Sequence, residues 1–197
     1  MNMRCGLICI GVAACFLAET HAADRTWLPT AGGSYEWQSA ANWQGGLLPG
    51  ANDQAQMRTT GQAGDQTIHL ANPVSLSSFF PGASDDSPFS QTFTGAAITP
   101  NPLFRVMGGH AIIENTVSLN GGTHALGLVK AGTLTVRDGG LLYSTNCANL
   151  NVGYRNTATT YFGGAGALLV ENNGTVRMRG STNSWTGGLF IGVNENS

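Results

Sequence analysis

Glycine and proline interrupt this chain so often that a long helix has little room to form. After residue 22, the longest run without either residue is Leu141–Val152, and it contains three asparagines. Helices in globular proteins need roughly 10 to 14 residues free of such breakers. Between the interruptions lie short runs of β-branched and aliphatic residues, several alternating with polar ones as a half-buried strand requires. The sequence therefore predicts an all-β protein.

The expected strands have three or four residues each. They are Thr67–Leu70, Val74–Leu76, Leu103–Val106, Ala111–Ile113, Val117–Leu119, Leu134–Val136, Leu168–Val170 and Thr175–Met178. Gly-Gly or Asn-Gly pairs separate many of them, at 108–109, 121–122, 139–140, 163–164, 173–174 and 187–188. We expect these pairs to provide the positive φ angles of tight turns.

Two segments of the chain recur. The sequence GTLTVRDGG at 132–140 returns as GALLVENNG at 166–174, and LNVGYRN at 150–156 returns as LFIGVNE at 189–195, with a looser copy at 103–109. Periods of about 20 to 50 residues are typical of solenoids and propellers. Because no propeller-blade signature is present, we predict a right-handed parallel β-helix, or β-solenoid. Its interior is expected to contain Leu134, Val136, Leu168, Val170 and Ile191.

The first 22 residues have the pattern of a secretory signal peptide. Arg4 precedes an apolar core at Leu7–Ala18, and the small-residue site Thr20-His21-Ala22 predicts cleavage before Ala23. Lipidation of Cys15 is the alternative. The apolar run is too short to span about 30 Å of hydrocarbon, so no transmembrane segment is expected in the mature chain. The predicted location is secreted or cell surface.

The remaining sequence provides no recognisable chemistry. A net charge of −2 with 10% charged residues argues against nucleic acid as a partner. After cleavage Cys147 is the only cysteine, and His69, His110 and His124 lie outside any metal-ligand motif. No carboxylate pair for glycoside hydrolysis, phosphate loop or nucleophile elbow is evident. We therefore expect no catalytic, metal-binding or cofactor-binding residues.

A second pattern follows the signal. It reads Thr26-Trp27, Tyr35-Glu36-Trp37, Asn42-Trp43, Gly45-Gly46, Leu48-Pro49-Gly50 and Asp53. It resembles the mature N-terminus of secreted bacterial β-helix repeat proteins, and the later Gly-Thr-Leu-Thr-Val repeat resembles autotransporter-associated β-strand repeats. The resemblance implies an exported, surface-associated structural or adhesive protein. The alternative is a β-helix protein that binds or cleaves polysaccharide.

The three tryptophans of this pattern have two interpretations. Trp27, Trp37 and Trp43 are predicted to cap the open apolar end of the first solenoid turn. Alternatively, exposed indoles form a platform that stacks on sugar rings. Asn42 and Asp53 are expected to hold their own loops through side-chain hydrogen bonds to the backbone.

The predicted organisation has one domain after the signal peptide. The segment 23–78 forms the cap and first strands, 79–102 is a Pro/Ser-rich loop or insertion, and 103–197 contains the solenoid repeats. Arg137 and Glu171 occupy adjacent repeat positions and are expected to lie near one another on the outer surface. The repeat is interrupted at Ser197, so we expect a fragment of a longer protein. Its last turn, with the apolar strand at 189–193, is expected to fray or to self-associate through that edge.

Overall fold

Strands dominate the computed structural model, which describes residues 23–58, 61–82, 87–127, 130–147, 149–153, 165–180 and 188–191. Within these ranges the only helices are two three-residue 3-10 segments, Ala40–Asn42 and Gln44–Gly46. The prediction of an all-β protein is therefore confirmed. The predicted signal peptide at 1–22 lies outside the described residues.

The strands are β1 (Asp24–Thr26), β2 (Gly33–Glu36), β3 (Gln54–Gln56), β4 (Gln66–Leu70), β5 (Val74–Phe80), β6 (Ser90–Gly95), β7 (Ile98–Val106), β8 (Gly109–Ile113), β9 (Thr116–Asn120), β10 (Thr123–Leu126), β11 (Gly132–Val136), β12 (Leu141–Cys147), β13 (Asn149–Val152), β14 (Gly166–Val170), β15 (Thr175–Gly180) and β16 (Gly188–Ile191). Each strand expected from sequence lies within one of these. The expectations missed β1, β2, β3, β6, β10, β12 and β13, which are short or rich in polar residues.

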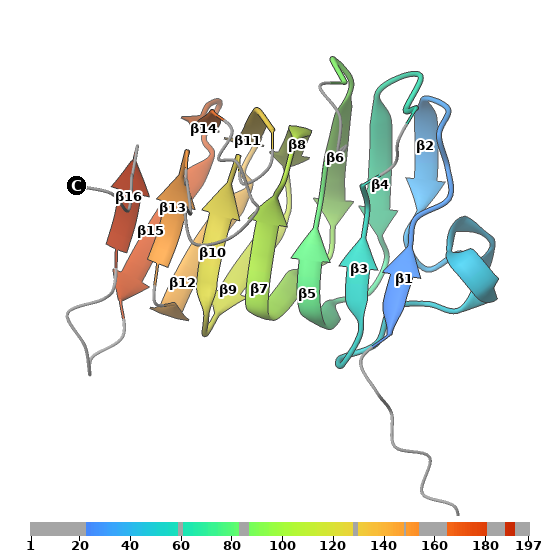
Figure 1. Cartoon of the computed structure of the whole chain (residues 1–197), viewed down its shortest axis with the longest axis horizontal. Helices are drawn as coiled ribbons and strands as arrows, with labels where there is room; N and C mark the ends of the chain where they lie inside the picture. The colour runs from blue at the N-terminus through green and yellow to red at the C-terminus, as the bar shows by residue number, and fades with distance from the viewer. Residues whose placement is uncertain are drawn as a thin grey trace, which may run out of the picture.

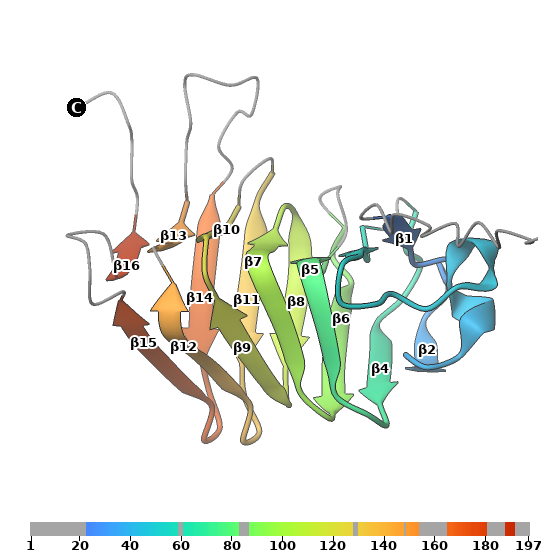
Figure 2. The ribbon, with the colours of Figure 1, turned by 90° about the horizontal axis from the view of Figure 1, so that it is seen from below.

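The strands pair in parallel and form three columns. Column 1 is β2-β4-β6-β8-β11-β14, and column 2 is β9-β12-β15. Column 3 is β1-β3-β5-β7-β10-β13-β16, in which the long β7 also pairs with β9 of column 2. Figure 1 shows columns 1 and 3 advancing from β2 and β1 at one end to β14 and β16 at the other, with column 2 running from β9 to β15, and Figure 2 shows them from below. The chain visits the columns in turn, so consecutive segments stack upon one another.

The repeat offsets of the sequence are strand-pairing registers in the structure. Gly132 pairs with Gly166 and Val136 with Val170, as the first repeat aligns them. Leu150 pairs with Leu189, as the second repeat aligns them. Other turns are shorter, since Arg137 lies 23 residues from its partner on the preceding turn. Insertions of different length therefore separate turns of otherwise similar shape.

Tight turns end several strands with the expected positive φ angles. At the turn 137–140, Asp138 has φ 52° and Gly139 has φ 84°, and the Gly140 amide donates to the Arg137 carbonyl at 2.8 Å. Two consecutive positive φ values define a type I′ turn. In the equivalent turn 171–174 the positive angles fall on Asn172 and Asn173, since asparagine also tolerates this region. Residues 163, 164 and 187, which belong to the two remaining pairs, lie outside the described residues.

The interpretation of residues 79–102 as a long loop or insertion is wrong. This segment contains the end of β5, all of β6 and the first half of β7. Pro100 and Pro102 are accommodated because the pairing of β5 with β7 shifts register between Leu76 and Ser78. Proline in sheets is confined to edges and irregularities of this kind. The segments 23–78 and 103–197 consequently belong to the same sheets.

The core lies between the columns and follows the expected inward positions with one exception. Leu134 and Val136 on β11 are fully buried, and Leu168 on β14 is partly buried against the same core. Val170 pairs in register with the buried Val136, but it is 52% exposed and so does not belong to the buried core that was expected to include it. It lies on β14, the last strand of column 1, where β11 covers one side only. The side chain of Ile191 lies outside the described residues.

Candidate functional site at the N-terminal end

The three tryptophans form one buried cluster at the end of the molecule that bears β1, β2 and the 3-10 segments (Figure 1). Each is only 1% exposed. The Trp43 ring lies edge-on to Trp27 at 5.1 Å and to Trp37 at 4.8 Å between centroids. Trp37 also packs on Phe79, which links the cluster to the rest of the core. No indole face is left for a sugar ring, so the carbohydrate-platform interpretation is wrong, whereas the burial agrees with a cap.

Glutamine side chains hold this aromatic cluster to the neighbouring turns. Gln66 on β4 and Gln91 on β6 are both fully buried and occupy paired positions in column 1. Gln66 accepts a hydrogen bond from the Trp27 indole at 3.2 Å and donates to the backbone carbonyls of Pro29 and Ala31. Gln91 donates to the Met57 carbonyl at 2.9 Å. Because buried polar groups are costly when unpaired, these bonds specify the packing of the cap.

Asn42 and Asp53 act as the sequence predicts. The Asn42 amide donates to the Glu36 carbonyl at 2.9 Å. The Asp53 carboxylate accepts from the Gly50 amide at 3.0 Å, which closes the Pro-Gly loop. Asp53 also accepts from the Ala23 amide at 3.0 Å and from Arg25 Nε at 3.2 Å. These two bonds join β1 to the loop that precedes β3.

Several contacts change the proton affinity of Asp53. Partial burial raises the pKa of this carboxyl, but the Gly50 and Ala23 amides and the Arg25 guanidinium together lower the pKa below its usual value. These donors therefore favour the charged form of the Asp53 carboxylate.

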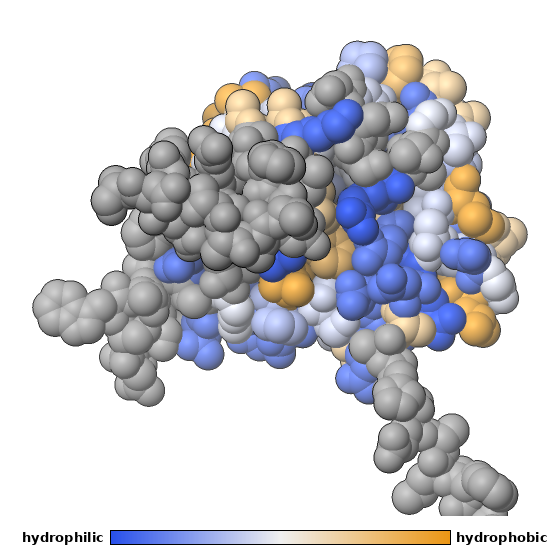
Figure 3. Space-filling model, viewed as in Figure 1, coloured by the Kyte–Doolittle hydropathy of each residue, from blue (hydrophilic) through white to orange (hydrophobic). Residues whose placement is uncertain are grey.

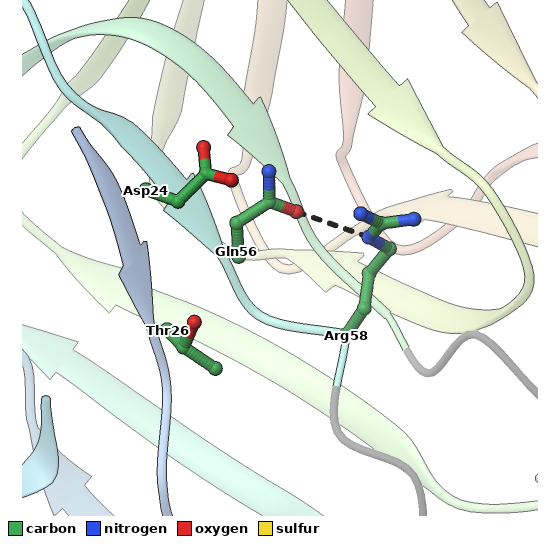
Figure 4. Close-up of a pocket in the computed structure, with 4 residues that line it drawn as sticks. All are labelled: Asp24, Thr26, Gln56 and Arg58. Atoms are coloured by element: carbon green, nitrogen blue, oxygen red, sulfur yellow. Dashed lines mark hydrogen bonds between the residues drawn. The ribbon is translucent and has the colours of Figure 1, made fainter. Parts of the chain in front are cut away.

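A polar groove lies on the outer face of β1 and β3. It is lined by Asp24, Thr26, Gln56 and Arg58 and has a volume of about 320 Å³. Figure 4 shows the four side chains around the groove, with Arg58 Nε donating to Gln56 Oε1 at 3.0 Å. The Arg58 guanidinium also stands over the Phe80 ring at 5.6 Å. This surface offers donors and acceptors to a polar ligand but only one carboxylate, and glycoside hydrolysis ordinarily uses two.

Three exposed leucines lie beside the segment that carries the 3-10 helices. Leu28, Leu47 and Leu48 are 49%, 54% and 41% exposed. They flank the segment that carries the 3-10 helices, and the Leu28 amide donates to the Asn42 carbonyl. Figure 3 shows hydrophilic surface over β1 and β3 and hydrophobic patches at the edge beside the 3-10 helices.

The histidines occur in three different environments and are not brought together. His69 is exposed and contacts Thr94, whereas His110 on β8 contacts Thr135 Oγ1 at 2.9 Å. His124 on β10 is fully buried, and its Nδ1 accepts from the Phe104 amide at 3.0 Å. Burial lowers the pKa of His124 to about 4. Among the described residues, no three His, Cys, Asp or Glu side chains are grouped to hold a metal ion.

The surface ion pair involves a partner different from the expected one. Arg137 Nε lies 2.9 Å from Glu114 on the preceding turn and 3.3 Å from Asp138. Glu171 occupies the adjacent position on the following turn, where its amide donates to the Val136 carbonyl. Glu114, Arg137 and Glu171 therefore occupy stacked positions on three successive turns. The Arg137 guanidinium makes its short contact with Glu114, on the preceding turn. The side chain of Cys147 lies outside the described residues.

Comparison of the chain with protein-family models, with curated proteins and with solved structures finds no match. In the part of the chain that the structure describes, no helix is long and apolar enough to cross a membrane.

Proposed function

We propose that the chain is an exported structural or adhesive protein of the cell surface or the extracellular space, built as a right-handed β-solenoid. The observation that carries this proposal is the stacking of consecutive turns in all three columns. Inner positions such as Ala111, Leu134 and Leu168 pair in sequence along column 1. A stack of this kind lengthens by adding turns, each stabilised mainly by its neighbours, and yields an extended, rigid particle.

The N-terminal end supports the same proposal. A stack of turns exposes an apolar cross-section at its end unless aromatic or polar residues cover it. Trp27, Trp37 and Trp43 bury their rings at this end, and the Trp43 indole donates to the Trp37 carbonyl at 2.8 Å. The resemblance of this segment to secreted bacterial β-helix repeat proteins implies the same location and role. Self-association through β16, whose backbone pairs with β13, belongs to the proposal.

Export is the part of the proposal that is simplest to test. A bacterial host that expresses the full chain is fractionated, and the N-terminus of the exported material is sequenced. We expect exported, surface-accessible protein beginning at Ala23. Protein retained in the cytoplasm with an intact N-terminus contradicts the proposal, and a lipidated Cys15 at the N-terminus supports the lipoprotein alternative.

A polysaccharide-binding function is the second candidate, and the polar groove favours it. Asp24, Thr26, Gln56 and Arg58 present hydrogen-bonding groups of the kind that sugar hydroxyls use. Calorimetric titration of the mature protein with neutral and acidic polysaccharides tests this candidate, with Arg58→Ala as the groove variant and Arg177→Ala on β15 as the matched control. Binding lost only in Arg58→Ala supports it. Release of reducing ends from any of these polymers contradicts the non-catalytic role.

A further inference from the structure

We propose that cleavage of the signal peptide creates a specific ion pair, in which the new α-ammonium group of Ala23 binds the carboxylate of Asp53. The inference rests on the proposed function through the cleavage position only. It assigns Asp53 as the receptor for the mature N-terminus, a role distinct from that of the other surface carboxylates.

Two separate observations meet at Ala23. The small-residue pattern Thr20-His21-Ala22 places the predicted cleavage directly before this residue. In the structure, the nitrogen of the same residue donates to Asp53 Oδ1 at 3.0 Å. Cleavage would replace this amide N–H with a charged ammonium at the same atom. The existing hydrogen bond then becomes a charge-assisted one, which is shorter and stronger than its neutral counterpart.

The surroundings hold both groups in place. The Ala23 carbonyl accepts from the Gln54 amide at 2.9 Å, so hydrogen bonds hold both the nitrogen and the carbonyl oxygen of this residue. Asp53 is fixed in turn, because its carboxylate accepts from Gly50 and its backbone carbonyl accepts from Ser77 at 2.9 Å. The Asp53 side chain is only 15% exposed, which limits screening of the pair by solvent. The ammonium would therefore meet a preorganised acceptor.

Other charged groups modify the pair without replacing it. Arg25 Nε lies 3.2 Å from the second carboxylate oxygen of Asp53, and its positive charge opposes that of the ammonium. Asp24 on β1 is the adjacent carboxylate and lines the polar groove instead. Because one carboxylate accepts from several donors, Asp53 can hold the ammonium and the guanidinium on different oxygens. Processing thus strengthens the join between β1 and β3.

The experiment is a double-mutant cycle that keeps the total charge of the N-terminus constant. Two proteins are released from a cleavable fusion, one beginning at Ala23 and one beginning at Ala22. The second retains an α-ammonium but moves it one residue away and leaves an amide at position 23. Each is prepared with Asp53 and with Asp53→Asn, and unfolding equilibrium constants are measured in urea at pH 6.5.

With Asp53 present, we expect the additional Ala22 to raise the unfolding constant about three- to tenfold. The reason is that a hydrogen bond to a charged group contributes more to folding stability than a neutral one, and this difference corresponds to about that factor in the unfolding constant. With Asp53→Asn, we expect the additional residue to have little effect. Asp24→Asn is the matched control and should retain the full effect of Ala22. Titration of the α-amino group by NMR provides a second readout, with a higher pKa in the Asp53 protein than in Asp53→Asn.

The outcomes separate this inference from the proposed function. Equal effects of Ala22 in the Asp53 and Asp53→Asn proteins overturn the ion pair, even where exported material begins at Ala23. An exported N-terminus at another residue overturns the inference but leaves export intact. Failure of export overturns the proposed function, whereas the cycle in purified protein still decides whether Asp53 binds the ammonium.

Discussion

Acid should destabilise this protein through His124 as the pH falls from 6.5 to 4. His124 lies on the inner face of β10, where it pairs with Leu150 of β13 and is fully buried. Its Nδ1 accepts the Phe104 amide proton, so the neutral ring fits the site. Burial lowers its pKa to about 4, and the nearby Arg105 guanidinium acts in the same direction.

The sign and size of the effect follow from the two protonation equilibria. In the unfolded chain the imidazole has its ordinary pKa of about 6.5. Between pH 6.5 and 4 the unfolded state therefore binds a proton that the folded state does not, and stability falls as the pH falls. At about 1.4 kcal/mol per pH unit, the total loss from this group is about 3 kcal/mol. The stabilisation is fully present above pH 6.5.

Urea unfolding followed by tryptophan fluorescence from pH 7.5 to pH 4 measures this loss. In His124→Asn, the amide oxygen can occupy the position of Nδ1 and accept the Phe104 proton, but it does not titrate. We expect this variant to have a much shallower pH dependence than the parent protein. His110→Asn removes the smaller contribution of a second histidine whose pKa burial lowers.

His69→Asn is the matched control, because His69 is exposed. It should reproduce the pH dependence of the parent protein. A His124→Asn variant that loses as much stability between pH 6.5 and 4 as the parent would refute the reasoning, because the buried imidazole would then not be the group that titrates.

Three further predictions concern the core, the turns and the cap. Leu134→Ala should cost about 2 to 5 kcal/mol in the free energy of unfolding, whereas Val170→Ala at an exposed position should cost less than about 1 kcal/mol; equal costs would contradict the observed burial. Gly140→Ala should prevent or strongly weaken folding because its Cβ would overlap a carbonyl of the neighbouring strand, while Gly139→Ala, with open space but a φ of 84°, should cost about 1 to 2 kcal/mol by urea titration. Trp43→Phe should lower the thermal midpoint because it removes an indole that donates to a buried carbonyl at 2.8 Å, and an unchanged midpoint would argue against the cap.

Local residue preferences were sufficient to predict about half of the strands and several of the turns. Strands at 132–136 and 166–170 follow from β-branched and aliphatic residues bounded by glycine, and their register follows from the aligned repeat. The loops closed by Asn42 and Asp53 were predictable because their bonds are made mostly within a few residues. Interactions of this kind depend on residues that are close along the chain.

The candidate site depended on contacts that the local sequence does not encode. Gln66 and Gln91 carry no signal of burial, because glutamine is usually exposed, and their paired positions arise from the register of column 1. The segment 79–102 contains prolines that argue locally against strands, but its residues 90–93 still join column 1 between β4 and β8. Neighbouring strands provide the hydrogen-bond partners that make this segment part of a sheet.

The sequence by itself determined that the chain is all-β, where about half of the strands and several tight turns lie, and that Ala23 follows a cleavage pattern. Tertiary structure decided that the tryptophans are buried and unavailable to sugars, that Arg137 pairs with Glu114, that Val170 is exposed, and that the nitrogen of Ala23 meets Asp53. The physical reason is that backbone preference and turn chemistry act over a few residues. Burial and pairing, in contrast, depend on which turns stack on either side, and the variable insertions between turns set that arrangement.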